Sequence, residues 1–350
     1  MTGPGASMAM ASAALFGAST PFAKLLLGAV DPWLLAGLLY LGSGIGLALV
    51  RLARRPLGIG ATEAPLRRAD APWLLLVVLA GGVAGPVLLM FGLARTSAAD
   101  AALLLNLEGL ATMAIAWVVF RENVDRRILL GALAILAGAA LLSWQGGPAG
   151  VGWGALLIAG ACLAWGIDNN LTRKLSGADP VQIAMLKGLA AGTVNLGLAL
   201  ARGAVLPAPD ALLGAGLIGF LGYGVSLTLF VLALRHLGTA RTGAYFSTAP
   251  FIGGAVAVAL FGQPVTLRLL GAALLMAIGI TLHLIERHEH EHVHEEMVHE
   301  HAHVHDEHHQ HMHGPSDPPG EPHVHAHRHT RLAHTHPHYP DLHHRHGHTG

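Results

Sequence analysis

The chain of 350 residues is 53% apolar and only 12% charged, and its mean hydropathy is +0.51. A soluble domain usually carries about 25% charged residues, so this composition excludes an ordinary soluble enzyme. The net charge of zero hides two opposite parts, because residues 1–285 carry +7 and residues 286–350 carry −7. The second part also holds 23 of the 25 histidines. We therefore treat the apolar body and the polar tail as separate regions.

The body contains a series of stretches long enough to cross a bilayer, which requires roughly 20 mostly apolar residues per helix. Ten such stretches are predicted, at about 7–27, 33–52, 72–94, 98–120, 128–144, 151–172, 180–201, 211–234, 241–261 and 267–285. No Lys or Arg precedes Lys24. The first stretch therefore lacks the basic start of a cleaved signal peptide, and we expect a retained span. The predicted fold class is an all-α polytopic membrane protein with a disordered tail.

The basic residues of the connections predict an orientation, because Lys and Arg accumulate in cytoplasmic loops. If the N-terminus is cytoplasmic, the cytoplasmic connections hold 13 Lys or Arg and the opposite ones hold 4. We expect both termini in the cytoplasm and the chain in the inner (plasma) membrane of a bacterium. The histidine-rich tail would then face the cytoplasm.

The body also repeats itself, with a second copy in its C-terminal half. Leu107-Glu108-Gly109 and Phe120-Arg121-Glu122 recur as Thr248-Ala249-Pro250 and Phe261-Gly262-Gln263. Five helices in each copy is an odd number, so the second copy would enter the membrane from the opposite side. This plan is typical of secondary transporters, which bind their solute between the halves. The predicted units are residues 1–145, residues 146–285 and a tail of residues 286–350.

On these motifs the body resembles the EamA family of the drug/metabolite transporter superfamily. In that family a Glu-Pro pair interrupts an apolar helix. Here the first copy keeps the acid as Glu108 and the second keeps Pro250, while Glu122 retains a helix-end acid that Gln263 has lost. The resemblance covers residues 7–285. It implies a ten-helix secondary transporter and not an enzyme, usually an exporter of small metabolites that moves its solute by alternating access.

Glu108 is the first candidate for the transport site. It is about the eleventh residue of the predicted span 98–120 and would lie near the bilayer centre. Ionisable residues at that depth are costly and usually functional. A carboxyl that gains and loses a proton can couple solute movement to protons. Asn106 is close in sequence, and Thr112 follows at i+4 on the same helical face. The alternative is a protonated structural acid bonded to a neighbouring helix.

Further polar residues in the spans are candidates for solute contact. Asp168 is followed by two amides in one helix, and Lys187 would lie roughly 11 Å inside another. Lys187 could pair with Asp168, bind an anionic solute or extend to the cytoplasmic face. The remaining candidates, each of which could instead join helices, are Asn169, Asn170, Asn195, Tyr223, Tyr245 and Ser247.

The tail alternates histidine with other residues in His-x-His runs, and neutral imidazole binds Ni, Co, Zn and Cu. Its Pro, Gly and charge predict disorder, with many interchangeable sites. The candidate metal ligands are His288, His290, His292, His294, His299, His301, His303, His305, His308, His309, His311, His313, His323, His325, His327 and His329. We expect no required cofactor, but a divalent transition metal on the tail.

Three functions remain open. The first is a small-solute exporter whose tail binds metal. The second is a nickel or cobalt exporter whose tail collects the ion, although the spans hold few metal-ligating residues. The third is a membrane-anchored metal store or sensor without transport, which the repeat disfavours. The expected partners are the lipid bilayer, a small-molecule or ion substrate and divalent metals, with a homodimer left open and no nucleic acid.

Overall fold

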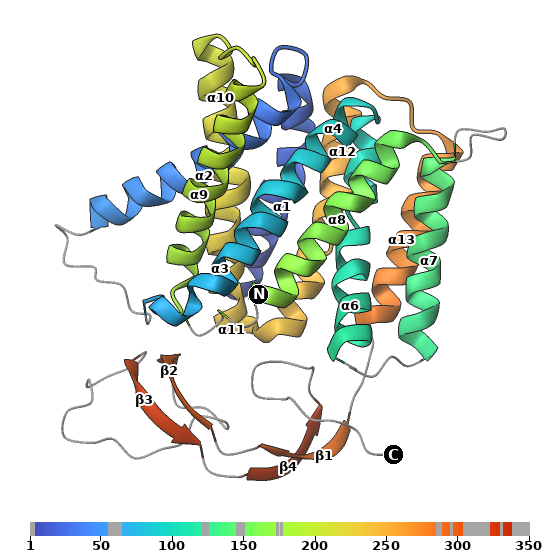
Figure 1. Cartoon of the computed structure of the whole chain (residues 1–350). Coiled ribbons are helices and arrows are strands. Elements are labelled where there is room, and N and C mark those ends of the chain that lie inside the picture. Colours follow the sequence, from blue (N-terminus) through green and yellow to red (C-terminus); the bar gives the residue numbers. More distant parts are fainter. Residues whose placement is uncertain are drawn as a thin grey trace.

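The computed structural model describes residues 4–54, 65–120, 126–144, 151–172, 175 and 178–284, and four short strands between residues 289 and 337. The body is helical throughout, and its helices lie side by side in one bundle (Figure 1). The first half consists of α1 (Pro4–Leu26), α2 (Pro32–Arg54), η2 (Arg68–Asp70), α3 (Ala71–Val77), η3 (Val78–Ala84), α4 (Gly85–Ala94), α5 (Ala98–Leu104), α6 (Leu107–Phe120) and α7 (Arg126–Ser143).

The second half follows the same sequence of elements. It consists of α8 (Trp153–Thr172), α9 (Pro180–Ala201), α10 (Pro209–Gly219), η5 (Phe220–Val225), α11 (Ser226–Phe246), α12 (Ala249–Phe261) and α13 (Leu267–Leu284). Both η3 and η5 are π-helical turns inside a longer helix, and each lies in the third long helical stretch of its half. Such turns are rare and often lie at functional sites, so their recurrence indicates a repeated structure.

The helices have the length and the surface of membrane spans. Six helical stretches of the described chain are long and apolar enough to cross a bilayer, and α12 and α13 contain shorter apolar stretches. Large apolar side chains point outward along the bundle, among them Val118 (71% exposed) and Leu213 (75% exposed). In water such a surface would favour aggregation, whereas lipid covers it without cost. The chain is a multi-pass membrane protein.

Two expected helix boundaries are wrong. The span predicted over 98–120 is interrupted at Leu105-Asn106, between α5 and α6. The break predicted between 234 and 241 does not occur, because α11 continues to Phe246 and the chain turns at Ser247-Thr248. No proline lies in residues 235–240 to stop the helix. The two actual breaks fall at equivalent places, one before α6 and the other before α12, so the halves are more alike than predicted.

The main helix contacts between the halves have counterparts in which the corresponding helices of the two halves are exchanged. Helix α8 packs against α4 and α6, and α1 packs against α11 and α12. Helices α2 and α9 pack on each other, as do α7 and α13. In that last pair Gly131 meets the backbone of Gly279, and Gly138 meets the backbone of Ala272. Ala272 is the counterpart of Gly131 in the repeat and Gly279 that of Gly138. The two contacts therefore exchange when the halves are exchanged.

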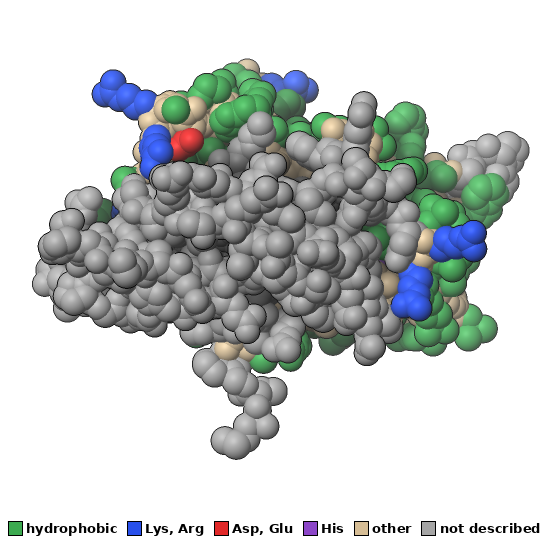
Figure 2. Space-filling view, turned by 90° about the horizontal axis from the view of Figure 1, so that it is seen from below, with side chains coloured by type: hydrophobic (Ala, Val, Ile, Leu, Met, Phe, Trp, Pro, Cys, Tyr) green, Lys and Arg blue, Asp and Glu red, His purple; other side chains and the backbone are tan. Residues whose placement is uncertain are grey.

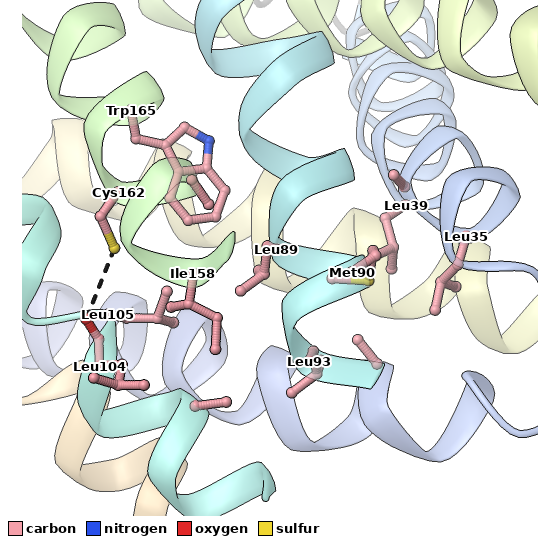
Figure 3. Packing of buried hydrophobic residues seen from close by; sticks show 14 of the residues in the cluster. Leu35, Leu39, Leu89, Met90, Leu93, Leu104, Leu105, Ile158, Cys162 and Trp165 are labelled. Atoms are coloured by element: carbon pink, nitrogen blue, oxygen red, sulfur yellow. Dashed lines mark hydrogen bonds between the residues drawn. The ribbon is translucent and has the colours of Figure 1, made fainter. Parts of the chain in front are cut away.

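The apolar core lies where helices of both halves meet. Figure 3 shows part of it, with α2, α4 and the end of α5 from the first half and α8 from the second. Cys162 is buried here as a free thiol, and its Sγ lies 3.8 Å from the carbonyl oxygen of Leu104. The labelled members of the cluster are Leu35, Leu39, Leu89, Met90, Leu93, Leu104, Leu105, Ile158, Cys162 and Trp165.

The tail was expected to be disordered, but the structure describes strands in it. They are β1 (Glu289–His294), β2 (Met297–His303), β3 (His323–His329) and β4 (Leu332–Pro337). β1 pairs antiparallel with β4, and β2 pairs antiparallel with β3. Side chains in a β-strand alternate with a period of two residues, and the His-x-His runs have the same period. The prediction of disorder considered composition and not this period. Figure 2 views the bundle from the side of the tail and shows Lys and Arg at its rim.

Candidate functional site

The interruption between α5 and α6 positions the acid that the sequence singled out. Glu108 is the second residue of α6 and lies in its first turn. The N-terminal turn of a helix carries partial positive charge, which suits a carboxylate. The Thr112 hydroxyl, one turn further on, donates to the backbone carbonyl of Glu108 at 2.9 Å. The predicted shared face of Glu108 and Thr112 is confirmed.

Helix α8 of the second half completes this group. The amide nitrogen of Asn169 lies 3.1 Å from the Glu108 carboxyl and 3.1 Å from the Thr112 hydroxyl. The amide nitrogen of Asn170 donates to the Thr112 carbonyl at 3.0 Å and to that of Gly166 at 2.8 Å. We call Glu108, Thr112, Asn169 and Asn170 the Glu108 cluster. It joins the two halves of the chain at the point where the first half is broken.

An ion pair lies beside this cluster. The Lys187 ammonium on α9 contacts the Asp168 carboxylate on α8, and the Thr172 hydroxyl donates to the other oxygen of Asp168 at 3.1 Å. The side chains of Asp168 and Lys187 are only 5% and 18% exposed. Pairing of these two residues was one of three predicted outcomes for Lys187, and it is the one the structure shows.

The π-helical turn η3 supports the ion pair from the first half. The carbonyl of Gly81 accepts the Tyr40 hydroxyl at 2.7 Å and the Trp165 indole N–H at 2.9 Å. The Asn195 amide donates to the Gly82 carbonyl at 3.0 Å. A π turn leaves carbonyls outside the regular helical pattern, and these three side chains satisfy them.

Glycine at position 81 leaves room for Asp168, because an added Cβ would overlap the side chain of that residue. Neither Tyr40 nor Trp165 was among the site residues predicted from the sequence. Because a π turn has no sequence signature of its own, only the Gly81-Gly82 pair inside an apolar span hinted at a close approach.

Some predicted site residues lie elsewhere. Asn106 turns away from Glu108, and its amide donates to the Leu103 carbonyl and approaches the sulfur of Met276 on α13. Tyr223 on η5 packs against the rings of Phe16 and Tyr40. Tyr245 and Ser247 lie where α11 ends. Asn106 was misplaced because the helix is interrupted at Leu105-Asn106, so the residues before and after the break do not follow one helical pattern.

The candidate metal ligands of the tail divide into two groups. His288, His305, His308, His309, His311 and His313 lie outside the described residues, and the other ten lie in the strands. Throughout the described part of the chain, no three His, Cys, Asp or Glu side chains are grouped to hold a metal. The intramembrane His283 lies at the α7–α13 contact, where its Nε2 is 3.0 Å from the Ile128 carbonyl.

Polar contacts also join the halves at the two ends of the bundle. At the end where α2 finishes and α9 begins, Arg51 of the first half pairs with Asp179 of the second at 3.2 Å. At the end where α5 and α13 begin, Arg268 of the second half pairs with Asp100 of the first at 3.4 Å. At the same end, the side-chain oxygen of Gln263 accepts a hydrogen bond from the backbone N–H of Ala99 at 3.1 Å. The halves are thus fastened to each other on both sides of the Glu108 cluster.

Comparisons with known proteins identify the family and the fold of the chain. A relative from Methanothermobacter thermautotrophicus, named only as an uncharacterized transporter, is 28% identical over 279 residues, which span 76% of this chain and 81% of the relative. A solved crystal structure has the same fold, with a TM-score of 0.59 at 21% identity over 80% of this chain and 98% of that one. Residues 3–144 and 152–285 each match the EamA-like transporter family, and the chain belongs to that family.

Proposed function

We propose that this drug/metabolite-type transporter is a proton-coupled exporter of a small solute, and that Glu108 carries the coupling proton. The observation that carries the proposal is the Glu108 cluster, where an acid at a helix break of one half contacts an amide of the other half at 3.1 Å. A proton on Glu108 changes the contact between the halves. Protonation and the relative position of the halves are therefore linked.

We further propose ten spans in two inverted five-helix halves that work by alternating access. The exchanged contacts of α1 and α8, and of Gly131 and Gly138, support a two-fold relation. An odd number of spans in each half makes that relation an inversion across the membrane. The Lys and Arg bias of the connections supports cytoplasmic termini and the plasma membrane as the location. Opening either side then requires breaking the Arg51–Asp179 or the Arg268–Asp100 pair.

Proteoliposomes that enclose a pH-indicator dye test the coupling. The purified full chain is reconstituted, and amino acids, nucleosides and nickel or cobalt salts are added one at a time. We expect at least one organic solute to move protons across the membrane. The variant Glu108→Gln should abolish that movement, and the matched control Asp210→Asn, which removes an exposed acid at the start of α10, should leave it unchanged. Full proton movement in the Glu108 variant would disprove the assignment.

A second candidate is metal efflux, with the tail collecting the ion. One observation favours metal binding by the tail: the register of β2 and β3 places His299 opposite His327, His301 opposite His325 and His303 opposite His323. Residues directly opposite each other in an antiparallel pair are neighbours across the two strands. Among the described residues, no three His, Cys, Asp or Glu side chains are grouped to hold a metal. We therefore propose metal binding by the tail as a property separate from solute export.

Two comparisons separate binding from efflux. Calorimetry with nickel and zinc on the full chain and on a chain ending at Ile285 should show micromolar binding only in the full chain. A strain lacking the gene is then grown under nickel, cobalt or zinc stress with either chain supplied. If neither chain changes metal tolerance, the proposal of metal efflux is wrong. If the calorimeter shows no heat with either metal, the proposal that the tail binds metal is wrong.

A further inference from the structure

A small polar cavity lies between the halves, at the end of the bundle where α5 and α13 begin. Its volume is about 110 Å³. Because liquid water occupies about 30 Å³ per molecule, the cavity has room for a small ionic group. The first half contributes the connection between α4 and α5 and the end of α7, and the second half contributes the start of α8 and Arg268 of α13. No residue of the Glu108 cluster lines it.

The charged groups of the cavity leave an excess of positive charge. Arg95 and Arg268 both line it, and Asp100 of α5 is the carboxylate among its lining residues. Arg268 lies 3.4 Å from Asp100 and 3.3 Å from the Trp144 carbonyl, both long for hydrogen bonds. Arg95 donates to the Phe91 carbonyl at 2.9 Å. A guanidinium has more N–H groups than these bonds use, so both arginines keep donors for a ligand.

Hydroxyl groups add uncharged donors to the cavity. The Ser97 oxygen accepts the backbone N–H of Asp100 at 3.1 Å, which leaves the Ser97 O–H to donate to a ligand. Thr96 also lines the cavity, and its backbone carbonyl accepts the Lys24 ammonium of α1 at 3.1 Å. Lys24 thereby fixes the connection between α4 and α5. Two guanidiniums and hydroxyl donors that are in place before binding suit an oxyanion such as a phosphate.

The surroundings of the cavity indicate a lipid headgroup as the source of that oxyanion. Trp144 follows α7 and Trp153 begins α8, and these residues are 54% and 76% exposed. Leu267 at the start of α13 is 88% exposed. Each of the three is next in sequence to a residue that lines the cavity. Tryptophan concentrates at the membrane interface, where lipid phosphates lie. A basic cavity with an exposed apolar rim suits a molecule that joins acyl chains to a phosphate.

We propose that this cavity binds the phosphate of an anionic phospholipid, with Arg95 and Arg268 as its main contacts. Ser97 donates a further hydrogen bond. Because Arg95 belongs to the first half and Arg268 to the second, the bound phosphate fastens the halves together beside the Arg268–Asp100 pair. The site goes beyond the proposed function, since it depends neither on the solute nor on a proton at Glu108.

Native mass spectrometry and thermal unfolding test the site on the full chain, purified free of lipid in an uncharged detergent. The lipid probes are phosphatidylglycerol, which carries a phosphate and a net negative charge, and an uncharged glycolipid with the same acyl chains. Inorganic phosphate and glycerol 3-phosphate present the anion without acyl chains. We expect one tightly bound phosphatidylglycerol, which raises the unfolding temperature less as salt is added. The other three probes should leave that temperature unchanged at the same concentration.

Variants assign the binding to the cavity. Arg95→Gln and Arg268→Gln should each weaken phosphatidylglycerol binding about tenfold, because each removes a charge-assisted contact to the phosphate. The matched control Arg202→Gln removes an exposed arginine at the same end of the bundle, where it lies over the ring of Trp33, and should bind like the natural chain. Asp100→Asn should lower the unfolding temperature without lipid, because the pair with Arg268 is lost. The same variant should bind phosphatidylglycerol more tightly, because a negative charge has left the cavity.

Any of four results would overturn the inference. The natural chain could fail to bind phosphatidylglycerol, or the two cavity variants could bind it as tightly as the natural chain, which would place the lipid elsewhere. Equal stabilisation by the glycolipid would show that the phosphate is not recognised. If inorganic phosphate or glycerol 3-phosphate stabilises the chain as strongly as the lipid does, the cavity is a site for a free oxyanion and the assignment to a lipid is wrong.

Discussion

The two π-helical turns occupy equivalent places in the two halves but have different surroundings. In the first half, Gly81 of η3 lies against Asp168, which is paired with Lys187. In the second half, Gly222 of η5 lies against the small hydroxyl side chain of Ser19. The backbone repeats while the charge does not. The comparison teaches that the repeat supplies a common framework, and that ionic chemistry has been placed on one side of it.

The hydroxyl contacts near η5 underline this difference. Ser12 and Ser226 are buried and bond to each other, with the Ser12 hydroxyl 2.7 Å from the Ser226 carbonyl and the Ser226 hydroxyl 2.9 Å from the Ser12 carbonyl. Neutral groups of this kind join helices without demanding a counter-charge. The difference between the charged and the neutral side leads to four expected effects, described below in order of size.

The largest effect is expected from breaking the ion pair. Lys187→Met alone should lower the free energy of unfolding by about 3–5 kcal/mol, because it leaves the buried Asp168 carboxylate uncompensated. The double variant Asp168→Leu with Lys187→Met should recover most of that loss. Unfolding in detergent of both single variants and the double variant gives the coupling energy. Single effects that simply add would show that the pair does not act as a unit.

Close packing should respond alike in both halves. Gly17→Ala places a Cβ against the backbone of α12 at Ala249, and Gly166→Ala places one against the backbone of α6 at Thr112. Each should cost about 1–3 kcal/mol, because backbone atoms cannot move aside as a flexible side chain can. Thermal unfolding of the two variants measures this. A cost confined to one half would contradict the equivalence of the α1–α12 and α6–α8 contacts.

A smaller effect is expected on the neutral side. Ser12→Ala together with Ser226→Ala should cost about 1–2 kcal/mol, since the two hydroxyls and their partners are lost together and no charge is left unpaired. The same unfolding assay compares this double variant with the ion-pair variants. A loss as large as that of Lys187→Met would mean that charge is not what distinguishes the two sides.

The smallest effect is a gain. Gly197 lies in α9 with no atom within 4 Å of an added Cβ, so Gly197→Ala should raise stability by about 0.5–1 kcal/mol through helix propensity alone. Because Gly197 lies outside both the charged and the neutral contacts, this variant also serves as the reference for Gly17→Ala and Gly166→Ala. A loss of stability here would indicate that the helix surface is covered by a partner.

The sequence by itself determined the membrane class, the repeat and the first candidate of the site. Long apolar stretches indicate that the helices lie in a lipid bilayer. An acid within such a stretch stands out because burying a charge in lipid is costly. The sequence also marked Lys187 and Asp168, whose pairing is the cheapest way to bury both charges. It could not choose between that pair and a free lysine, because α8 and α9 meet only in the folded chain.

Only the tertiary structure decided the breaks and the partners. At the interruption at Leu105-Asn106, Asn106 contacts α13 whereas Glu108 contacts α8, although the two residues are close in sequence. The π turn at Gly81 recruits Tyr40 and Trp165 from helices far away along the chain. Such irregular backbone persists because contacts across the bundle satisfy groups that a regular helix would satisfy by itself. Those contacts depend on the packing of both halves, which no local pattern encodes.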